Sequence, residues 1–164
     1  MTVEDLNRMD CEAFTAALGW IFENSPWVAE RTWAQRPFDG VTALHEAMVR
    51  EVAAADPPEQ AALIRAHPDL GARARMSDAS VGEQASAGLD RLTPTEFERL
   101  QGLNRAYREK FGFPFIYAVK GSTKHDVLRA LAERLTGDPQ AELAIALAQI
   151  YRIAQFRLEE SIHA

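Results

Sequence analysis

HPDLGARARMSDASVGEQ, residues 67–84, is the stretch around which the rest of the chain can be interpreted as helical scaffold. Pro68 disfavours helical backbone in the residue before it, so a preceding helix must end at about His67. Gly71 allows a turn, and Ser77 is a residue type that caps helix N-termini. The stretch therefore predicts two helices joined by a loop, and it places an imidazole in that loop.

Start signals for further helices lie on both sides of this stretch. Two segments combine an N-cap residue, a proline at the first helical position and a carboxylate at the third: Asp56-Pro57 with Glu59, and Thr93-Pro94 with Glu96. Either Asp39 or Thr42 is expected to cap an earlier helix that reaches about Ala55. The Ser77 helix is expected to continue to Leu92. Apolar spacing also predicts helices in residues 2–22, from Gly121 to Gly137 and from Asp138 almost to the C-terminus, with a loop and a short helix over 23–38.

FGFPFIYAVKG, residues 111–121, is the one segment of extended type. It is rich in aromatic and β-branched residues, but Pro114 argues against a central strand. A sheet would need several such runs. The sequence therefore predicts an all-α fold, a single-domain helical bundle over residues 1–164 with one extended segment near 112–120.

Composition excludes several classes of function. The formal net charge is -6, and no Lys/Arg cluster offsets it, so we expect no nucleic-acid surface. No apolar run is long enough for a membrane span, and the acidic N-terminus MTVEDLNRMD does not resemble a signal peptide. Cys11 is the only cysteine, which fits a reducing compartment. There is no HExxH, CxxC or GxGxxG pattern, so no metal site is expected. We therefore expect a soluble, cytoplasmic protein.

The helix that follows Ser77 carries a chemically varied polar face. Four residues at helical spacing share it: Ser80, Glu83, Gln84 and Ala87. Another face is the natural candidate for the core: Val81, Ala85, Gly88, Leu89 and Leu92. The polar face either meets water or lines a site. Two glycines within the helix, Gly82 and Gly88, each cost up to about 1 kcal/mol against alanine, which makes sense where a ligand approaches the backbone.

Two further features can be interpreted in more than one way. Arg157 falls in the apolar stripe of the last helix, which comprises Leu143, Leu147, Ile150, Ala154, Arg157 and Ser161. It can snorkel, pair with a buried glutamate, or bind a carboxylate of a ligand. The extended segment is either an apolar plug or a source of backbone groups that hydrogen-bond a flat polar heterocycle. His67 is the side chain best suited to move protons near neutral pH, although a lone histidine is more often structural.

HPDLG at 67–71, SVGEQASAGL at 80–89, FGFPFIYAVKG at 111–121 and the terminal RIAQFRL together resemble the family of 2-oxo-4-hydroxy-4-carboxy-5-ureidoimidazoline (OHCU) decarboxylases. The likeness covers nearly the whole chain in order and spacing. It implies an all-α fold, no cofactor, and conversion of OHCU to (S)-allantoin with loss of CO2 in urate degradation. Family members are often homodimers, so a homodimer is possible here.

By motif match, the resemblance implies roles for residues in four parts of this sequence. His67 and Glu83 would be catalytic, with His67 as the acid/base. The residues implied to contact the substrate are Pro68, Ser80, Gln84, Phe115, Ile116, Val119 and Arg157. We hypothesise that Glu83 hydrogen-bonds His67 and that all these groups converge on one small cavity. A non-catalytic helical domain that binds a urate-like or ureide ligand is the main alternative, and a lyase or hydrolase acting on another ureide is the second.

Overall fold

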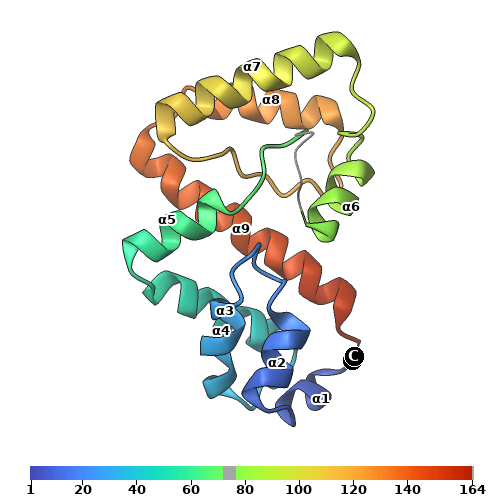
Figure 1. The fold of residues 1–164 in the computed structure, drawn as a ribbon, viewed down its shortest axis with the longest axis vertical. Helices are drawn as coiled ribbons and strands as arrows, with labels where there is room; N and C mark the ends of the chain where they lie inside the picture. The colour runs from blue at the N-terminus through green and yellow to red at the C-terminus, as the bar shows by residue number, and fades with distance from the viewer. Residues whose placement is uncertain (72–76, 164) are drawn as a thin grey trace. The chain divides into compact units, whose positions relative to one another are not determined.

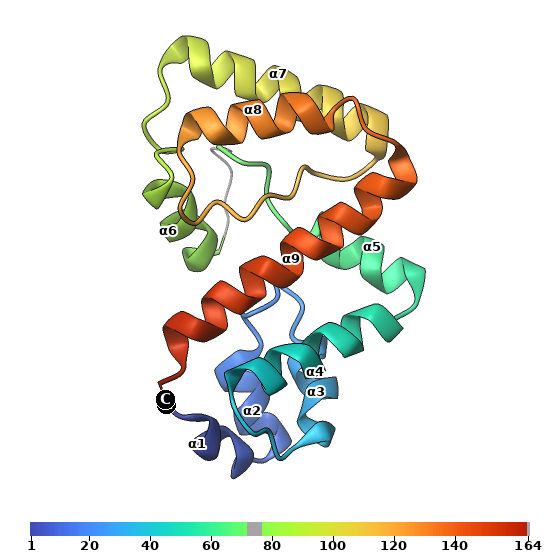
Figure 2. The same ribbon diagram turned by 180° about the vertical axis from the view of Figure 1, so that it is seen from behind.

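The computed structural model describes residues 1–71 and 77–163 (Figures 1 and 2). Within these ranges the regular structure is helical, and the β-type pairing consists of one isolated bridge between Thr2 and His163. The all-α prediction is therefore confirmed. No helix in the described ranges is both long and apolar enough to cross a membrane. The chain divides into two compact units, Met1–Ala66 with Tyr151–Ala164, and His67–Ile150. A single domain over residues 1–164 stays a prediction.

The first unit is built from short helices and the end of the last one. Its elements are α1 (Val3–Asn7), α2 (Cys11–Leu18), α3 (Trp27–Thr32), the 3-10 helix η1 (Trp33–Gln35), α4 (Val41–Ala54), α5 (Pro57–Arg65) and the C-terminal part of α9 (Pro139–Ser161). Helix α3 packs against α2 and α4. Apolar residues at helical spacing in residues 11–21 and in α4 are buried: Phe14, Leu18 and Ile21, and Leu44, Met48 and Val52. The loop with a short helix predicted for 23–38 is also confirmed.

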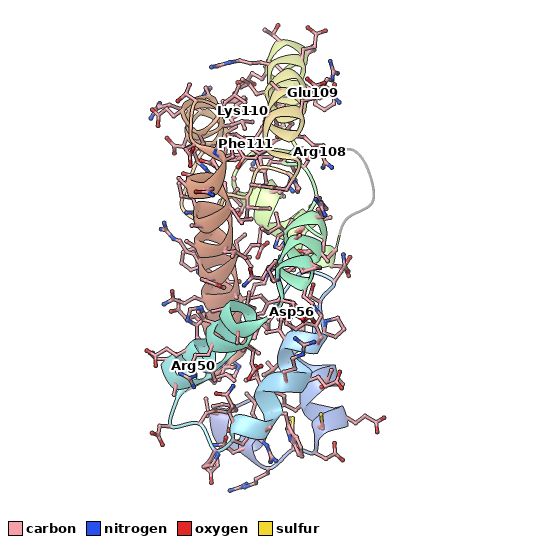
Figure 3. The ribbon with its side chains drawn as sticks, turned by 90° about the vertical axis from the view of Figure 1, so that its left-hand side faces the viewer. Arg50, Asp56, Arg108, Glu109, Lys110 and Phe111 are labelled. Atoms are coloured by element: carbon pink, nitrogen blue, oxygen red, sulfur yellow. The ribbon has the colours of Figure 1, made fainter. Side chains whose placement is uncertain are left out.

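The cap prediction for α4 is wrong. Gly40, in extended backbone, occupies the N-cap position, and no side chain caps this helix. Asp39 therefore lies one position too early, and Thr42 lies inside the first turn. At α5, Asp56 is the N-cap residue with Pro57 at the first helical position, as predicted, but its side chain makes no capping hydrogen bond. Figure 3 labels Asp56 at the start of this helix.

The second unit contains α6 (Asp78–Ser86), α7 (Pro94–Phe111), α8 (Lys124–Arg134) and the N-terminal part of α9. Helices α7 and α8 lie side by side and run in the same direction, and the chain between them returns as an extended segment without strand pairing (Figures 1 and 2). Capping boxes start both helices, Thr93 with Glu96 and Thr123 with Asp126. Gly112, with φ 78°, ends α7 in the left-handed region.

Helix α6 is shorter than expected, since it ends at Ser86 rather than Leu92. Gly88 has φ 81° and donates its N–H to Ala85 O at 3.0 Å, while Leu89 N–H donates to Gln84 O at 3.0 Å. These two bonds form a Schellman motif, in which the left-handed residue just past a helix is usually glycine. Gly88 is therefore a helix terminator, and the interpretation that it lies within the helix to let a ligand approach is wrong.

The stripe predicted for α9 is also wrong at its start. Leu143 is 40% exposed, whereas Glu142 is 2% exposed. The buried row continues from Glu142 at four-residue steps through Ala146, Ile150 and Ala154. The carboxylate of Glu142 is buried because Arg134 and Tyr107 hydrogen-bond to it, so a pair of polar partners decides which face of the helix points inward.

Candidate active site

The HPDLG loop is held by side chains from two helices of the second unit. Asn104 of α7 donates from Nδ2 to Leu70 O at 3.0 Å, and Gly71 N–H donates to Gln84 Oε1 of α6 at 2.8 Å. These two bonds engage the C=O and the N–H of the same peptide, between Leu70 and Gly71. Because both amide side chains are buried, the bonds are sheltered from competition with water. The loop that begins with His67 is therefore fixed at its far end.

Two further features constrain this loop. Asp69 forms an ion pair with Arg108 of α7 at 2.7 Å; Figure 3 labels Arg108 near the C-terminal end of that helix. Gly71 has φ 71°, and a Cβ built on it would lie 2.4 Å from Leu100 Cδ2. The turn predicted at Gly71 thus needs glycine both for its backbone conformation and for space. His67, four residues earlier, is 7% exposed.

The polar face of α6 is the buried face. Ser80 and Gln84 are 5% and 6% exposed, so the alternative in which this face meets water is wrong. Val81 is 51% exposed, so its assignment to the core is wrong as well. Burying these polar side chains is tolerable because they have hydrogen-bond partners, as Gln84 has in Gly71. Glu83 lies on the same helix and is half-buried.

The extended segment is anchored through its backbone. Arg134 of α8 donates from Nη1 to Ile116 O at 2.6 Å, and Ala118 N–H donates to Gln149 Oε1 of α9 at 2.9 Å. The Ala118 N–H is thereby occupied and is not the group that would read a heterocycle. Phe115, Ile116 and Val119 are all buried.

Arg134, which holds Ile116 O, also belongs to a buried polar cluster. The Arg134 guanidinium binds Glu142 at 2.8 Å, and Tyr107 OH donates to the same carboxylate at 2.5 Å. Burial, and then the hydrogen bond to Glu142, raise the pKa of Tyr107 well above its ordinary value. The Arg134 guanidinium also stacks over the Phe115 ring at 4.5 Å. Sequence reasoning missed Arg134 and Glu142, because the pair bridges a helix boundary and belongs to no periodic pattern.

Three of the predicted site segments converge in the second unit. Leu70 of the loop, Ala87 and Leu89 after α6, and Phe115 and Val119 of the extended segment belong to one hydrophobic cluster. This cluster brings together the backbones that carry His67, the α6 polar residues and residues 115–119. The three segments carry an imidazole, a carboxylate, a hydroxyl and amides, which are groups suited to proton transfer on a small polar ligand, and the convergence of these side chains on one cavity stays a prediction.

Arg157 belongs to the first unit, and its convergence with His67 stays a prediction. Its Nη2 binds Glu23 Oε2 at 2.9 Å, and Nη1 donates to the carbonyl oxygens of Trp20 and Ile21, each at 3.3 Å. Arg157 and Glu23 are 3% and 1% exposed. Of the alternatives that the sequence left open, pairing with a buried glutamate is therefore present. A role in substrate binding would come in addition to this pair.

Comparison with known proteins decides the family. The sequence profile of the OHCU decarboxylases matches residues 7–159. The chain belongs to the OHCU decarboxylase family. It is 49% identical over 160 residues to the 2-oxo-4-hydroxy-4-carboxy-5-ureidoimidazoline decarboxylase of Halalkalicoccus jeotgali, an alignment that covers 98% of this chain and 91% of the relative. It is 37% identical to the mouse protein of the same description, covering 100% of this chain and 94% of that relative.

Some relatives carry the OHCU decarboxylase region within a longer chain. The chain is 50% identical to a uric acid degradation bifunctional protein of Bacillus subtilis, covering 98% of this chain and 33% of that protein. Among solved structures, an (S)-allantoin synthase superposes with a TM-score of 0.79 at 35% identity, covering 99% of this chain and 54% of that one. An OHCU decarboxylase crystallised in the presence of (S)-allantoin superposes with a TM-score of 0.72 at 22% identity, covering 93% and 97%, and shows the shared fold.

Proposed function

We propose that this protein decarboxylates OHCU to (S)-allantoin in urate degradation. The observation that carries the proposal is its 49% identity, over 98% of its length, to a protein described as an OHCU decarboxylase. The buried imidazole of His67, on a loop fixed at the Leu70–Gly71 peptide, supplies a group that can move protons at a fixed position.

The reaction needs little from the protein beyond orientation and protons. When the bond between the ring carbon and the carboxylate breaks, its electron pair enters the ring and the neighbouring C=N accepts charge. CO2 leaves, and the nitrogen of that C=N takes up a proton, which is the one proton that the overall reaction consumes. The substrate hydroxyl then loses its proton to become the carbonyl of allantoin, and the adjacent ring carbon gains a proton. A protein that delivers this proton to one face alone produces one enantiomer. Positioning and charge stabilisation by fixed polar groups account for such catalysis.

Within this scheme, each candidate residue has a specific role. His67, hydrogen-bonded to Glu83, takes the hydroxyl proton. Ser80, Gln84, Pro68 and the backbone near Phe115, Ile116 and Val119 hold the heterocycle and its ureido group. Arg157 contacts an anionic group of the substrate while it pairs with Glu23.

The test supplies freshly made OHCU and follows CO2 release together with the chirality of the allantoin. Stereoselectivity is the decisive readout, because the substrate also decays unaided to racemic product. We expect His67→Gln to lower kcat by about a hundredfold or more, which is the scale of general acid/base catalysis. His125→Gln, at an exposed position on α8, is the matched control and should retain activity. If wild-type protein yields racemic allantoin at the uncatalysed rate, the proposed function is wrong. A non-catalytic binding domain would give that result with ligand affinity intact in His67→Gln.

We also propose a homodimer that works in the cytoplasm. The resemblance to a family with homodimeric members supports the first part, and the single cysteine of the sequence fits a reducing compartment. Light scattering after size-exclusion chromatography measures the oligomeric state, and fluorescence of a tagged protein in the source cell reports its location. A monomer at working concentration would contradict the dimer.

A further inference from the structure

The Leu70–Gly71 peptide is gripped on both sides by buried amide side chains. Its carbonyl oxygen accepts from Asn104 Nδ2 at 3.0 Å, and its N–H donates to Gln84 Oε1 at 2.8 Å. The C=O and N–H of a trans peptide point in opposite directions, so the two side chains approach from opposite sides. Asn104 comes from α7 and Gln84 from α6, and the two bonds therefore tie both helices to the loop of His67.

Asn104 would be a poor choice for this position if packing were all that mattered. The residue is 7% exposed, and its Oδ1 has no hydrogen-bond partner among the described residues. A buried acceptor without a partner is costly, and a leucine of similar size in this apolar face of α7 would avoid the cost. The feature that leucine could not replace is the Nδ2–H bond to the loop. The amide is therefore explained by that bond.

The same peptide also decides how the amide of Gln84 is oriented. Only an oxygen can accept the Gly71 N–H, so Oε1 faces the loop, and Nε2 is the end of the amide left to meet a ligand. Gln84 would thus donate a hydrogen bond to an oxygen of the substrate, such as a carbonyl or carboxylate. If the peptide were free to rotate, this choice between donor and acceptor would no longer be fixed.

We propose that Asn104 is a positioning residue of the active site, which holds the Leu70–Gly71 peptide and through it the His67 loop and the donor end of Gln84. The proposal rests on the decarboxylase activity proposed above. Asn104 does not touch the substrate in this scheme. Its removal changes catalysis because the loop and the Gln84 amide lose their common support.

The first variant is Asn104→Leu, which removes the donor and the buried orphan acceptor together. We expect the protein to stay folded, with kcat about tenfold lower and KM for OHCU raised, because a loosened geometry weakens transition-state contacts. Hydrogen exchange of the Gly71 amide, followed by NMR, should accelerate. Gln101→Leu, at an exposed position on the same helix, is the control and should change neither kinetics nor exchange.

The second variant, Asn104→Asp, adds a readout that a structural role alone would not move. At about pH 8 the carboxylate cannot donate to Leu70 O, and kcat should fall as in Asn104→Leu. At about pH 5.5 burial favours the protonated acid, whose O–H can donate, so the ratio of variant to wild-type kcat should recover. Taking the ratio at each pH cancels titration of groups common to both proteins. Gln101→Glu should show a ratio that does not depend on pH.

The outcomes separate this inference from the proposed function. If wild-type protein makes no (S)-allantoin, the function fails, and the exchange of the Gly71 amide in Asn104→Leu still decides whether Asn104 holds the loop. If wild-type protein is active, the positioning role is overturned when folded Asn104→Leu keeps kcat and KM within about twofold of wild type. It is also overturned when the Asn104→Asp ratio is the same at both pH values.

Discussion

Replacing Arg157 with methionine should strongly destabilise the protein. The guanidinium is 3% exposed and lies 2.9 Å from the carboxylate of Glu23, which is 1% exposed. Methionine fills similar space but removes the cation, so Glu23 is left buried next to an apolar side chain. Breaking a buried pair in this way costs about 3–5 kcal/mol. For a chain of this length, about 2–4 °C per kcal/mol places the fall in Tm at roughly 6–20 °C.

Thermal and urea unfolding, followed by circular dichroism, measure the loss. The double variant Arg157→Met with Glu23→Leu should recover most of it, because a well-packed apolar pair often replaces a buried ion pair with little or no cost. The single losses would then add up to far more than the double loss. A Tm change below about 2 °C in Arg157→Met, or additive losses in the double variant, would refute the reasoning.

Kinetics separate the ion pair from any contact with substrate. Measured well below the unfolding transition, Arg157→Met should raise KM for OHCU, since the proposed function gives the guanidinium an anionic group to bind. Glu23→Gln keeps the guanidinium and serves as the matched control for the loss of the ion pair. Equal KM values in the two variants would assign Arg157 to stability alone.

Three other substitutions test separate parts of the second unit. Gly71→Ala, with φ 71° and no room for a methyl group, should cost about 2–4 kcal/mol in urea unfolding and lower kcat, and a wild-type midpoint would contradict the close packing. Tyr107→Phe removes the donor to buried Glu142 and should cost about 1–3 kcal/mol, seen as a lower urea midpoint with an unchanged m value. The hydrogen bond from Lys124 lowers the pKa of Glu96 from 4.5 to about 2, so its stabilisation is complete above pH 4.5 and is lost as the pH falls toward 2. Glu96→Gln should therefore lose less stability than wild type over that acid range, and parallel acid profiles would refute this assignment.

Local signals in the sequence predicted much of the fold. The N-cap residue and proline that start α5, the capping box that starts α7 and the apolar spacing in residues 2–22 all depend on residues within a few positions of one another. These local signals did not predict which face of a helix is buried where a hydrogen-bond partner far along the chain determines it. Helical spacing shows that Ser80 and Gln84 share a face of α6. It does not show that this face is buried, because burial depends on the hydrogen bond between Gln84 and the distant Gly71 N–H. Spacing likewise could not show that Glu142 is buried with Arg134.

The candidate site was predictable to a similar extent. The motif likeness predicted that the HPDLG loop, α6 and the extended segment lie together. Apolar side chains of the loop, of the residues after α6 and of the extended segment do belong to one cluster. Asn104 and Arg134, which hold the loop and the extended segment, were overlooked because each bonds to the backbone of another segment. For Asn104 a signal existed, since an amide stands among Leu100, Tyr107 and other apolar residues on one face of α7. A polar residue in such a face, when unpaired within its own helix, indicates a bond to another segment.

The two backbone anchors of the extended segment restrict insertions between them to even numbers of residues. Arg134 Nη1 donates to Ile116 O and Ala118 N–H donates to Gln149 Oε1, and the two anchored groups lie two residues apart in an extended backbone, whose carbonyl and N–H directions alternate from one residue to the next. Inserting one residue between them would turn every downstream carbonyl and N–H to the opposite edge, and the two anchors could not both be kept. Inserting a pair would restore the alternation. Relatives that differ in length here should therefore differ by even numbers of residues.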